Sequence, residues 1–356
     1  MKIVDVKISP LNLEPVMALT VAYGSYDMFE YALLELVTDD GLVGLGEASP
    51  DTEVTGETQA SDMAALDAAR DVLIGKDPFD IEIIIRELEA IIPDAPSALA
   101  AVDMALYDLM GKALGVPVCR LLGGKAQAAI TAYPVVPLDT PEVMAGTAAQ
   151  FAAGGAKALK LKIGTTIEED VARMAAIRTV IGDEIILRID VNQGWGDAAT
   201  AIEAIKALMP YKAAYYEQPV KDTDIDGMAE VRRAVDVPIM ADESLHSPAD
   251  ALEIIQKGAA DILNIKLMKC GGIYRGLQIH ALGEAAGLPC IVGSMGESSI
   301  ASAAGVHFSA AKASIESCEA IGPLFVKNDP ATGFLADMEH MVLLPSDAPG
   351  LGVVLK

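Results

Sequence analysis

The stretch Lys157-Ala-Leu-Lys-Leu-Lys-Ile-Gly164 sets the pattern of the chain. It is an apolar run that carries Lys160 and Lys162 two positions apart, and on a strand this spacing points both side chains to one face. The next run, Ile185-Ile-Leu-Arg-Ile-Asp190, ends on a carboxylate and follows a helix-length segment, 169–181. Short apolar strands that alternate with helices are typical of a parallel α/β fold.

The same unit repeats through residues 123–320, and the charged strand ends fall roughly 25 residues apart, the length of one βα unit. We therefore predict a modified (β/α) TIM-type barrel. An open doubly wound sheet is the alternative, although no Gly-x-Gly-x-x-Gly motif opens a helix after a strand. The expected strands are 130–134, 158–162, 185–190, 214–217, 238–242, 262–266, 289–293 and 314–318.

The first part of the chain places strands before helices. Asp39-Asp40-Gly41 joins two apolar runs, 31–38 and 42–47, which predicts a hairpin, and the glycines from Gly41 to Gly46 are attributed to turn geometry. Helical patterns follow at 61–73, 80–92 and 97–114. We expect an N-terminal α+β capping domain over residues 1–122, a barrel over 123–320 and a C-terminal segment over 321–356 that returns to the cap.

The chain is strongly acidic, with 26 Lys and Arg against 51 Asp and Glu and a net charge of −25. This charge argues against nucleic acid and membrane as partners and is attributed to a solvating surface. The four cysteines form no Cys-x-x-Cys pair, so we expect buried free thiols in a reducing compartment. The start of the chain does not resemble a signal peptide, and we expect a cytoplasmic protein.

Charged side chains also end the later strands of the repeat. Asp190, Glu217 and Asp242 each follow an apolar strand, and Lys266 follows another. Taken singly, each is also compatible with a cap or a solvated loop position. In a parallel barrel, however, these strand ends share one face, and three carboxylates there need a counter-ion. Hard oxygen ligands suit Mg²⁺, with Mn²⁺ as an alternative.

Lysines beside such a cation are suited to proton transfer. Lys160 and the metal would disfavour protonation of Lys162, while Lys266 would lie four strands round the barrel. The arrangement favours removal of the proton next to a substrate carboxylate, with the metal stabilising the enolate. A Schiff-base lysine aldolase and a non-enzymatic, metal-stabilised barrel are the alternatives from other classes.

These motifs resemble those of the enolase superfamily, in particular its muconate-lactonizing-enzyme subgroup, in which a lysine base works with Mg²⁺. The resemblance covers nearly the whole chain and implies Lys162 as the base, Lys160 as its pKa-lowering neighbour and Lys266 as the opposite-face lysine. It also implies that Asn192 and Glu243 support the metal ligands. The matching motifs are Lys160-x-Lys162, Asp190-Val-Asn192, Glu217-Gln-Pro219, Asp242-Glu-Ser244 and Asn264-Ile-Lys-Leu-Met-Lys-Cys-Gly-Gly272. Mandelate-racemase-like members instead use a histidine at the seventh strand, where this chain has Ile291-Val-Gly-Ser294, so its four histidines are not catalytic candidates.

Two signals point to different reactions within the subgroup. The segments 293–300 and 55–58 are similar to those of dipeptide epimerases, which also carry an Asp-x-Asp at the eighth strand end for the substrate ammonium. Here Glu319 and Ile321 stand at those positions, and Glu-x-x-Gly-Pro-Leu resembles muconate cycloisomerases. A second interpretation of Glu319 is a tether for Lys266. We predict a racemase or epimerase of a dipeptide or N-acyl amino acid, with muconate-type cycloisomerase or o-succinylbenzoate synthase as the alternative.

Substrate contacts are expected from cap loops around 23–28 and 51–57, which would close over the barrel mouth and exclude water. The expected partner is a small-molecule carboxylate, and we expect a homo-oligomer. The expected contact residues are Tyr23, Tyr26, Thr55, Ser294, Met295, Glu319 and Ile321.

Overall fold

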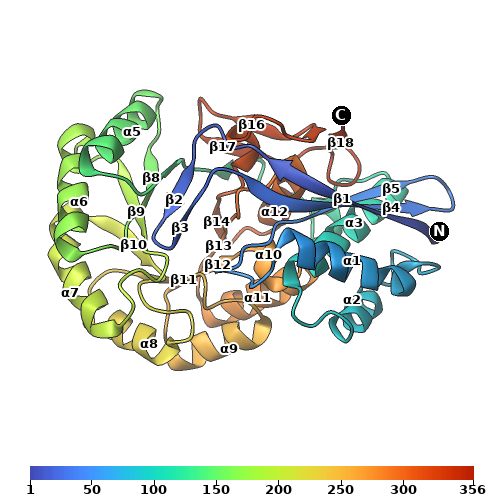
Figure 1. Ribbon diagram of the computed structural model, residues 1–356, viewed down its shortest axis with the longest axis horizontal. Coiled ribbons are helices and arrows are strands. Elements are labelled where there is room, and N and C mark those ends of the chain that lie inside the picture. Colours follow the sequence, from blue (N-terminus) through green and yellow to red (C-terminus); the bar gives the residue numbers. More distant parts are fainter.

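The computed structural model describes residues 1–356, and its N-terminal part, at the right of Figure 1, is an antiparallel sheet covered by helices. The sheet has the order β1-β4-β5, and the predicted hairpin joins β4 to β5 with Gly41 at a φ of 87°. A second hairpin, β2–β3, extends toward the barrel (Figure 1). The bounds are β1 Ile3–Leu13, β2 Leu19–Val21, β3 Gly24–Tyr26, β4 Phe29–Thr38, β5 Val43–Ala48, α1 Gln59–Leu73, α2 Ile81–Glu89, α3 Pro96–Leu114 and α4 Val118–Leu121.

Gly44 and Gly46 on β5 do not serve the turn, so the attribution of all these glycines to turn geometry was wrong. A Cβ on Gly46 would lie 1.9 Å from the carbonyl oxygen of Ala101, and one on Gly44 would lie 2.3 Å from that of Ala105. Both oxygens belong to the backbone of α3. The two glycines therefore allow this helix to lie directly on the strand.

A parallel eight-stranded sheet forms the barrel, with helices α5 to α9 along its outer side in Figure 1. Its hydrogen-bonded order is β14-β13-β12-β11-β10-β9-β8-β7, and β7 and β14 are not paired with each other. The strands are β7 Val135–Val136, β8 Ala158–Lys162, β9 Ile186–Asp190, β10 Ala213–Glu217, β11 Ile239–Ala241, β12 Ile262–Ile265, β13 Cys290–Val292 and β14 Ile315–Cys318. The helices are α5 Pro141–Ala153, α6 Ile167–Ile181, α7 Ala198–Leu208, η1 Met209–Tyr211, α8 Ile225–Ala234, α9 Pro248–Lys257, α10 Leu267–Cys270, α11 Ile273–Ala286, α12 Ser299–Ala311 and η2 Gly322–Leu324.

The predicted barrel is confirmed, but its first strand was assigned to the wrong residues. Ile130–Thr131 (β6) pairs with β17 (Val342–Leu344) of the C-terminal segment, and the barrel uses β7 instead. A two-residue strand has too short a pattern to be separated from a neighbouring apolar run. The helix boundaries follow ordinary capping chemistry, since the side chains of Thr166 and Ser247 accept hydrogen bonds from backbone N–H groups at the starts of α6 and α9.

The C-terminal segment touches both the cap and the barrel. Val326 bridges to Pro15, and Glu14 donates its backbone N–H to Asn328 Oδ1. The other strands of the segment are β15 Ala331–Thr332, β16 Leu335–Asp337 and β18 Val354–Leu355, with β16 next to β17 and β15 paired with β18. The division of the chain at residues 122 and 320 stays a prediction.

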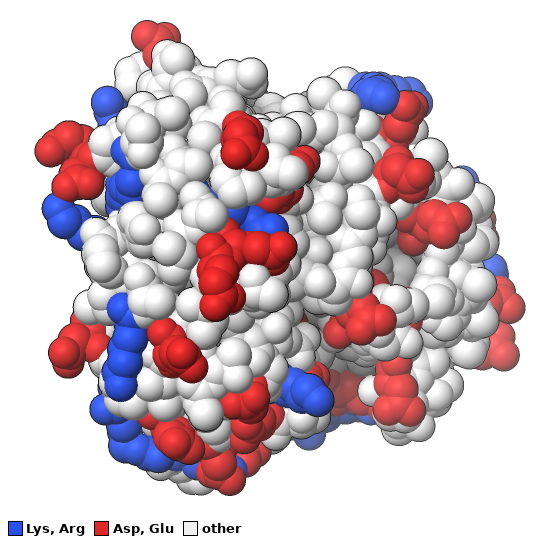
Figure 2. Space-filling view, turned by 60° about the vertical axis from the view of Figure 1, so that its left-hand side comes forward, with Lys and Arg blue, Asp and Glu red and all other residues white.

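The buried apolar side chains fall into two main clusters, one under the cap sheet and one in the barrel and its helices, and α3 contributes to both. All four cysteines are buried and free, as predicted. Acidic side chains are spread over the face shown in Figure 2, with smaller groups of basic ones between them. The helices include none with the length and apolar character that a membrane span requires.

Candidate active site

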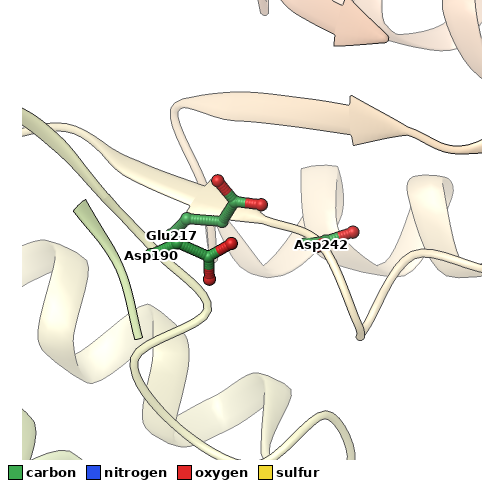
Figure 3. Close-up of side chains that lie close together, drawn as sticks. All are labelled: Asp190, Glu217 and Asp242. Atoms are coloured by element: carbon green, nitrogen blue, oxygen red, sulfur yellow. The ribbon is translucent and has the colours of Figure 1, made fainter. Parts of the chain in front are cut away.

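Asp190, Glu217 and Asp242 meet at the C-terminal ends of β9, β10 and β11 (Figure 3). One carboxylate oxygen of each lies within 4.8 Å of the others, and all three side chains are fully buried. Asp190 and Glu217 are paired residues in the parallel ladder of β9 and β10, and Asp242 directly follows β11. The register of three neighbouring strands therefore brings the predicted carboxylates together.

These carboxylates fit a divalent metal ion. Oε2 of Glu217 and Oδ2 of Asp242 are buried and accept no hydrogen bond of good geometry. Lys160 Nζ lies 2.8 Å from the Glu217 oxygen, and Lys266 Nζ lies 2.8 Å from the Asp242 oxygen. Each oxygen therefore has a positive charge nearby and keeps a free lone pair. Several buried carboxylate oxygens that converge on one point are the donor set that Mg²⁺ and similar hard cations prefer.

The backbone is strained directly after two of the three carboxylates. Asn192, Gln193 and Gln218 have φ angles of 44°, 66° and 38°, a left-handed region that residues other than glycine rarely adopt. Gln218 Oε1 accepts the backbone N–H of Asp242 at 3.0 Å, which ties the end of β10 to the end of β11. This role was missed from the sequence, where Gln218 appeared only as the middle residue of a motif.

Asn192 and Glu243 lie beside the carboxylates, and their support of the metal ligands stays a prediction. Asn192 donates its amide to Glu243 Oε1 at 2.9 Å, and its Oδ1 accepts from Lys162 Nζ at 3.0 Å. Burial, followed by the charges of Asp242 and Asp190, raises the pKa of Glu243 to about 7.

Lys162 and Lys266 reach the carboxylates from opposite sides. Lys162 Nζ lies 2.6 Å from Asp190 Oδ2, and Lys266 Nζ lies 2.8 Å from Asp242 Oδ2. Lys162 is the last residue of β8 and Lys266 directly follows β12, and in the sheet these strands lie on either side of β9, β10 and β11. Both side chains are buried and line the same cavity. A group bound between them would be exposed to a lysine on each face.

Lys160 is surrounded by carboxylates. Its Nζ lies 3.0 Å from Asp190 Oδ2, 2.8 Å from Glu217 Oε2 and 2.9 Å from Glu319 Oε2. Burial lowers the pKa of Lys160, but these three carboxylates outweigh burial and raise the pKa well above its usual value. In the same way, burial opposes ionisation of Asp190, whereas Lys160 and Lys162 hold its pKa at about 2. Lys160 is therefore a fixed positive charge beside Lys162.

Lys269 is a further residue of the site that was missed from the sequence. It lies on α10, is 1% exposed, and donates to Asp242 Oδ1 at 2.5 Å and to the backbone carbonyl of Asp242. The two carboxylate oxygens of Asp242 thus face different lysines, Lys269 on Oδ1 and Lys266 on Oδ2. The only sequence signal was its position three residues after Lys266.

The interpretation of Glu319 as a tether for Lys266 was wrong. Glu319 Oε1 and Oε2 lie 3.0 and 2.9 Å from Lys160 Nζ, and Oε1 also accepts the hydroxyl of Tyr133 at 3.0 Å. Glu319 directly follows β14, at one end of the sheet order, and Lys160 lies on β8, next to the strand at the other end, so the two side chains meet across the barrel.

A cavity of about 320 Å³ lies between the barrel mouth and the cap, and Lys160, Lys162, Asn192 and Lys266 line its barrel side. The predicted contact residues Tyr23, Tyr26, Ser294, Met295, Glu319 and Ile321 all line it. Thr55 does not, because its hydroxyl is used inside its own loop, where it donates to the carbonyl of Asp51 at 3.1 Å. The role of Thr55 as a substrate contact stays a prediction.

The cap side of the cavity combines apolar side chains with three carboxylates, Glu30, Asp51 and Glu57. Met17, Met28, Phe29 and Phe325 are among its lining residues, and the cap contributes no lysine or arginine to it. None of the four histidines lines the cavity. His307, for example, is buried and hydrogen-bonded through Nε2 to the carbonyl of Leu351.

Two family models match the chain. One is described as mandelate racemase / muconate lactonizing enzyme, N-terminal domain, and matches residues 3–123, and the other, enolase C-terminal domain-like, matches residues 143–356. A hydrophobic dipeptide epimerase from Enterococcus faecalis is 39% identical over 99% of both chains. The chain belongs to the enolase superfamily.

Other relatives place this member of the enolase superfamily in the muconate-lactonizing-enzyme subgroup. An N-succinyl-L-Arg/Lys racemase from Bacillus cereus is 38% identical over 99% of this chain and 95% of its own length. Muconate cycloisomerase 1 from Rhodococcus opacus is 32% identical over 91% and 88% of the two chains. The crystal structure of a dipeptide epimerase from Enterococcus faecalis, complexed with Mg and the dipeptide L-Leu-L-Tyr, has a TM-score of 0.95, 38% identity and 99% coverage of both chains. These relatives are isomerases, and the predicted family and enzyme class are confirmed.

Proposed function

We propose that the protein is a Mg²⁺-dependent racemase or epimerase that inverts the α-carbon of a dipeptide or an N-acyl amino acid. The observation that carries the proposal is the placement of Lys162 and Lys266 on opposite sides of three buried carboxylates. Inversion requires removal of a proton from one face of a carbon and its return to the other, which two opposed lysines can do.

The metal would be held by Asp190, Glu217 and Asp242. When bound, Mg²⁺ would supply a divalent charge that stabilises the negative charge that develops on the substrate carboxylate as the α-proton leaves. Lys160, kept charged by its carboxylate neighbours, would add a second positive charge for the same substrate group.

The two base lysines exchange roles with the direction of the reaction. In one direction Lys162, as a neutral amine, takes the α-proton, and Lys266, as an ammonium group, returns a proton to the opposite face. In the other direction the roles reverse. Burial lowers the pKa of Lys266, but the charge of Asp242 outweighs burial and raises it. A divalent cation held by Asp242 would oppose the effect of this carboxylate and favour the neutral amine that the reverse direction requires.

The substrate class follows from the cavity and the relatives. The substrate carboxylate would sit at the three lysines, which leaves the rest of the molecule in the cavity under the cap. Relatives at 38–39% identity act on dipeptides and on N-succinyl amino acids, as their names state. Closure of the cap loops over such a substrate would exclude water from the reacting carbon.

The test is isotope exchange at the α-carbon. The protein, Mg²⁺ and panels of dipeptides, N-succinyl amino acids and muconates would be incubated in D₂O and examined by mass spectrometry. We expect α-deuterium in a dipeptide or N-acyl amino acid, and loss of this exchange when EDTA removes the metal. Conversion of a muconate without exchange of any amino-acid derivative would refute the assignment as a racemase or epimerase, and full activity in EDTA would refute the metal.

A further inference from the structure

We infer that Glu319 is a positioning residue that holds Lys160 in place, and that it does not bind a substrate ammonium. The contacts carry this inference independently of the substrate, while its consequence for turnover rests on the proposed function.

Both carboxylate oxygens of Glu319 are already used. Oε1 and Oε2 lie 3.0 and 2.9 Å from Lys160 Nζ, and the Tyr133 hydroxyl donates to Oε1 at 3.0 Å. The side chain is 6% exposed, so water can replace few of these contacts. Ile321, two residues later, offers no second carboxylate. A substrate ammonium at this strand end would have to share Glu319 with the ammonium of Lys160, whose positive charge would repel it.

The barrel interior also fixes the tyrosine that holds Glu319. Tyr133 is fully buried, and the guanidinium carbon of Arg188 lies 3.9 Å from the centre of its ring. Arg188 donates through Nη1 to Ser317 Oγ at 3.0 Å, and Ser317 lies two residues before Glu319 on β14. Residues of β9 and β14 thus support both ends of the Tyr133–Glu319 contact.

Glu319 is the only carboxylate partner of Lys160 that does not belong to the candidate metal site. The other two, Asp190 and Glu217, belong to the set that would hold Mg²⁺. A metal ion and Lys160 would therefore lie against the same two carboxylates. Glu319 offers the ammonium a partner outside the candidate metal site, and its side chain reaches both Lys160 and Tyr133. We expect an aspartate, shorter by one methylene, to lose this bridge while keeping the charge.

The first test is Mg²⁺ binding to the full-length protein without substrate, measured by calorimetry in Glu319→Gln, Glu319→Asp and Tyr133→Phe. We expect the Kd to rise about tenfold in both Glu319 variants, because Lys160 then relies on Asp190 and Glu217 alone, and about threefold in Tyr133→Phe. Tyr133→Phe changes no charge and so separates position from net charge. Wild-type Mg²⁺ affinity in both Glu319→Asp and Tyr133→Phe would overturn the inference, since only the charge would then matter.

The second test compares two substrates with the same reacting residue, one with a free ammonium and one N-acylated. We expect Glu319→Gln to lower kcat about tenfold for both, with KM changed little, because Lys160 serves each reaction alike. A rise in KM confined to the free-ammonium substrate would overturn the inference and make Glu319 a substrate ligand. If the wild-type protein processes neither substrate, the proposed function fails, and the Mg²⁺ titrations still decide the role of Glu319.

Discussion

Lys162→Ala should abolish α-proton exchange from one epimer of the substrate and spare the other. Lys266→Ala should do the reverse. The two lysines lie on opposite sides of the carboxylates, so each can reach the α-proton of only one configuration. A positioned general base contributes typically about 10²- to 10⁴-fold to the rate, or about 3 to 5 kcal/mol in the barrier. Exchange from the affected epimer should fall by that factor, and interconversion of the epimers should stop in both variants.

The structure indicates that both variants keep the fold and the metal site. Without Lys162, Oδ2 of Asp190 still has Lys160 at 3.0 Å, and without Lys266, Asp242 still has Lys269 at 2.5 Å. A buried carboxylate without any cation would be strongly destabilising, and neither variant leaves one. Thermal unfolding and Mg²⁺ affinity of the two variants therefore serve as controls.

The measurement is proton NMR in D₂O with Mg²⁺, with each pure epimer as the starting material in a separate experiment. Complementary loss, one epimer in each variant, is the expected result. Equal loss of exchange from both epimers in a variant that still binds Mg²⁺ would refute the assignment of one lysine to each face. Continued interconversion in either variant would show that the lysine in question is not a base.

Three further perturbations probe the surroundings of the site. Gly293→Ala should slow exchange from both epimers at least tenfold in the same NMR assay, because the new Cβ would lie 2.4 Å from Oδ1 of Asn264, whose amide donates to Glu217, and 2.8 Å from Cγ of Lys266. Lys269→Met should lower the free energy of unfolding in urea by about 3 kcal/mol, since it leaves the buried Oδ1 of Asp242 without its hydrogen-bond donor, whereas Lys266 faces Oδ2. Burial raises the pKa of Glu47 from 4.5 to about 7, so its contribution to stability is full below pH 4.5 and is lost as the pH rises through 7. From pH 4.5 to 7.5, the free energy of unfolding in urea should therefore fall by up to about 3 kcal/mol more in the wild-type protein than in Glu47→Gln. An equal fall in the two proteins would contradict the role of burial.

Regular spacing made the barrel and the centre of the site predictable from the sequence. Asp190, Glu217 and Asp242 come at the ends of consecutive parallel strands. Residues that are one βα unit apart along the chain therefore lie on neighbouring strands in the fold. Lys162 and Lys266 were found by the same reasoning, because their strands belong to the same repeat. The short strand at 130–134 was misplaced because two-residue strands carry almost no periodic signal.

Which side chain meets which across the barrel was decided only by the tertiary structure. Glu319 directly follows the last strand of the barrel and Lys160 lies on the second, 159 residues away, and the curvature of the sheet makes them partners. Lys269 became part of the site because α10 turns it inward behind Asp242. Thr55 lies outside the cavity lining, and local hydrogen bonds within its loop use its hydroxyl. The sequence alone therefore predicted which charged residues lie at the strand ends, because the spacing of strands and helices can be read along the chain. Contacts across the barrel depend on sheet curvature and loop packing, and the folded chain was needed to show them.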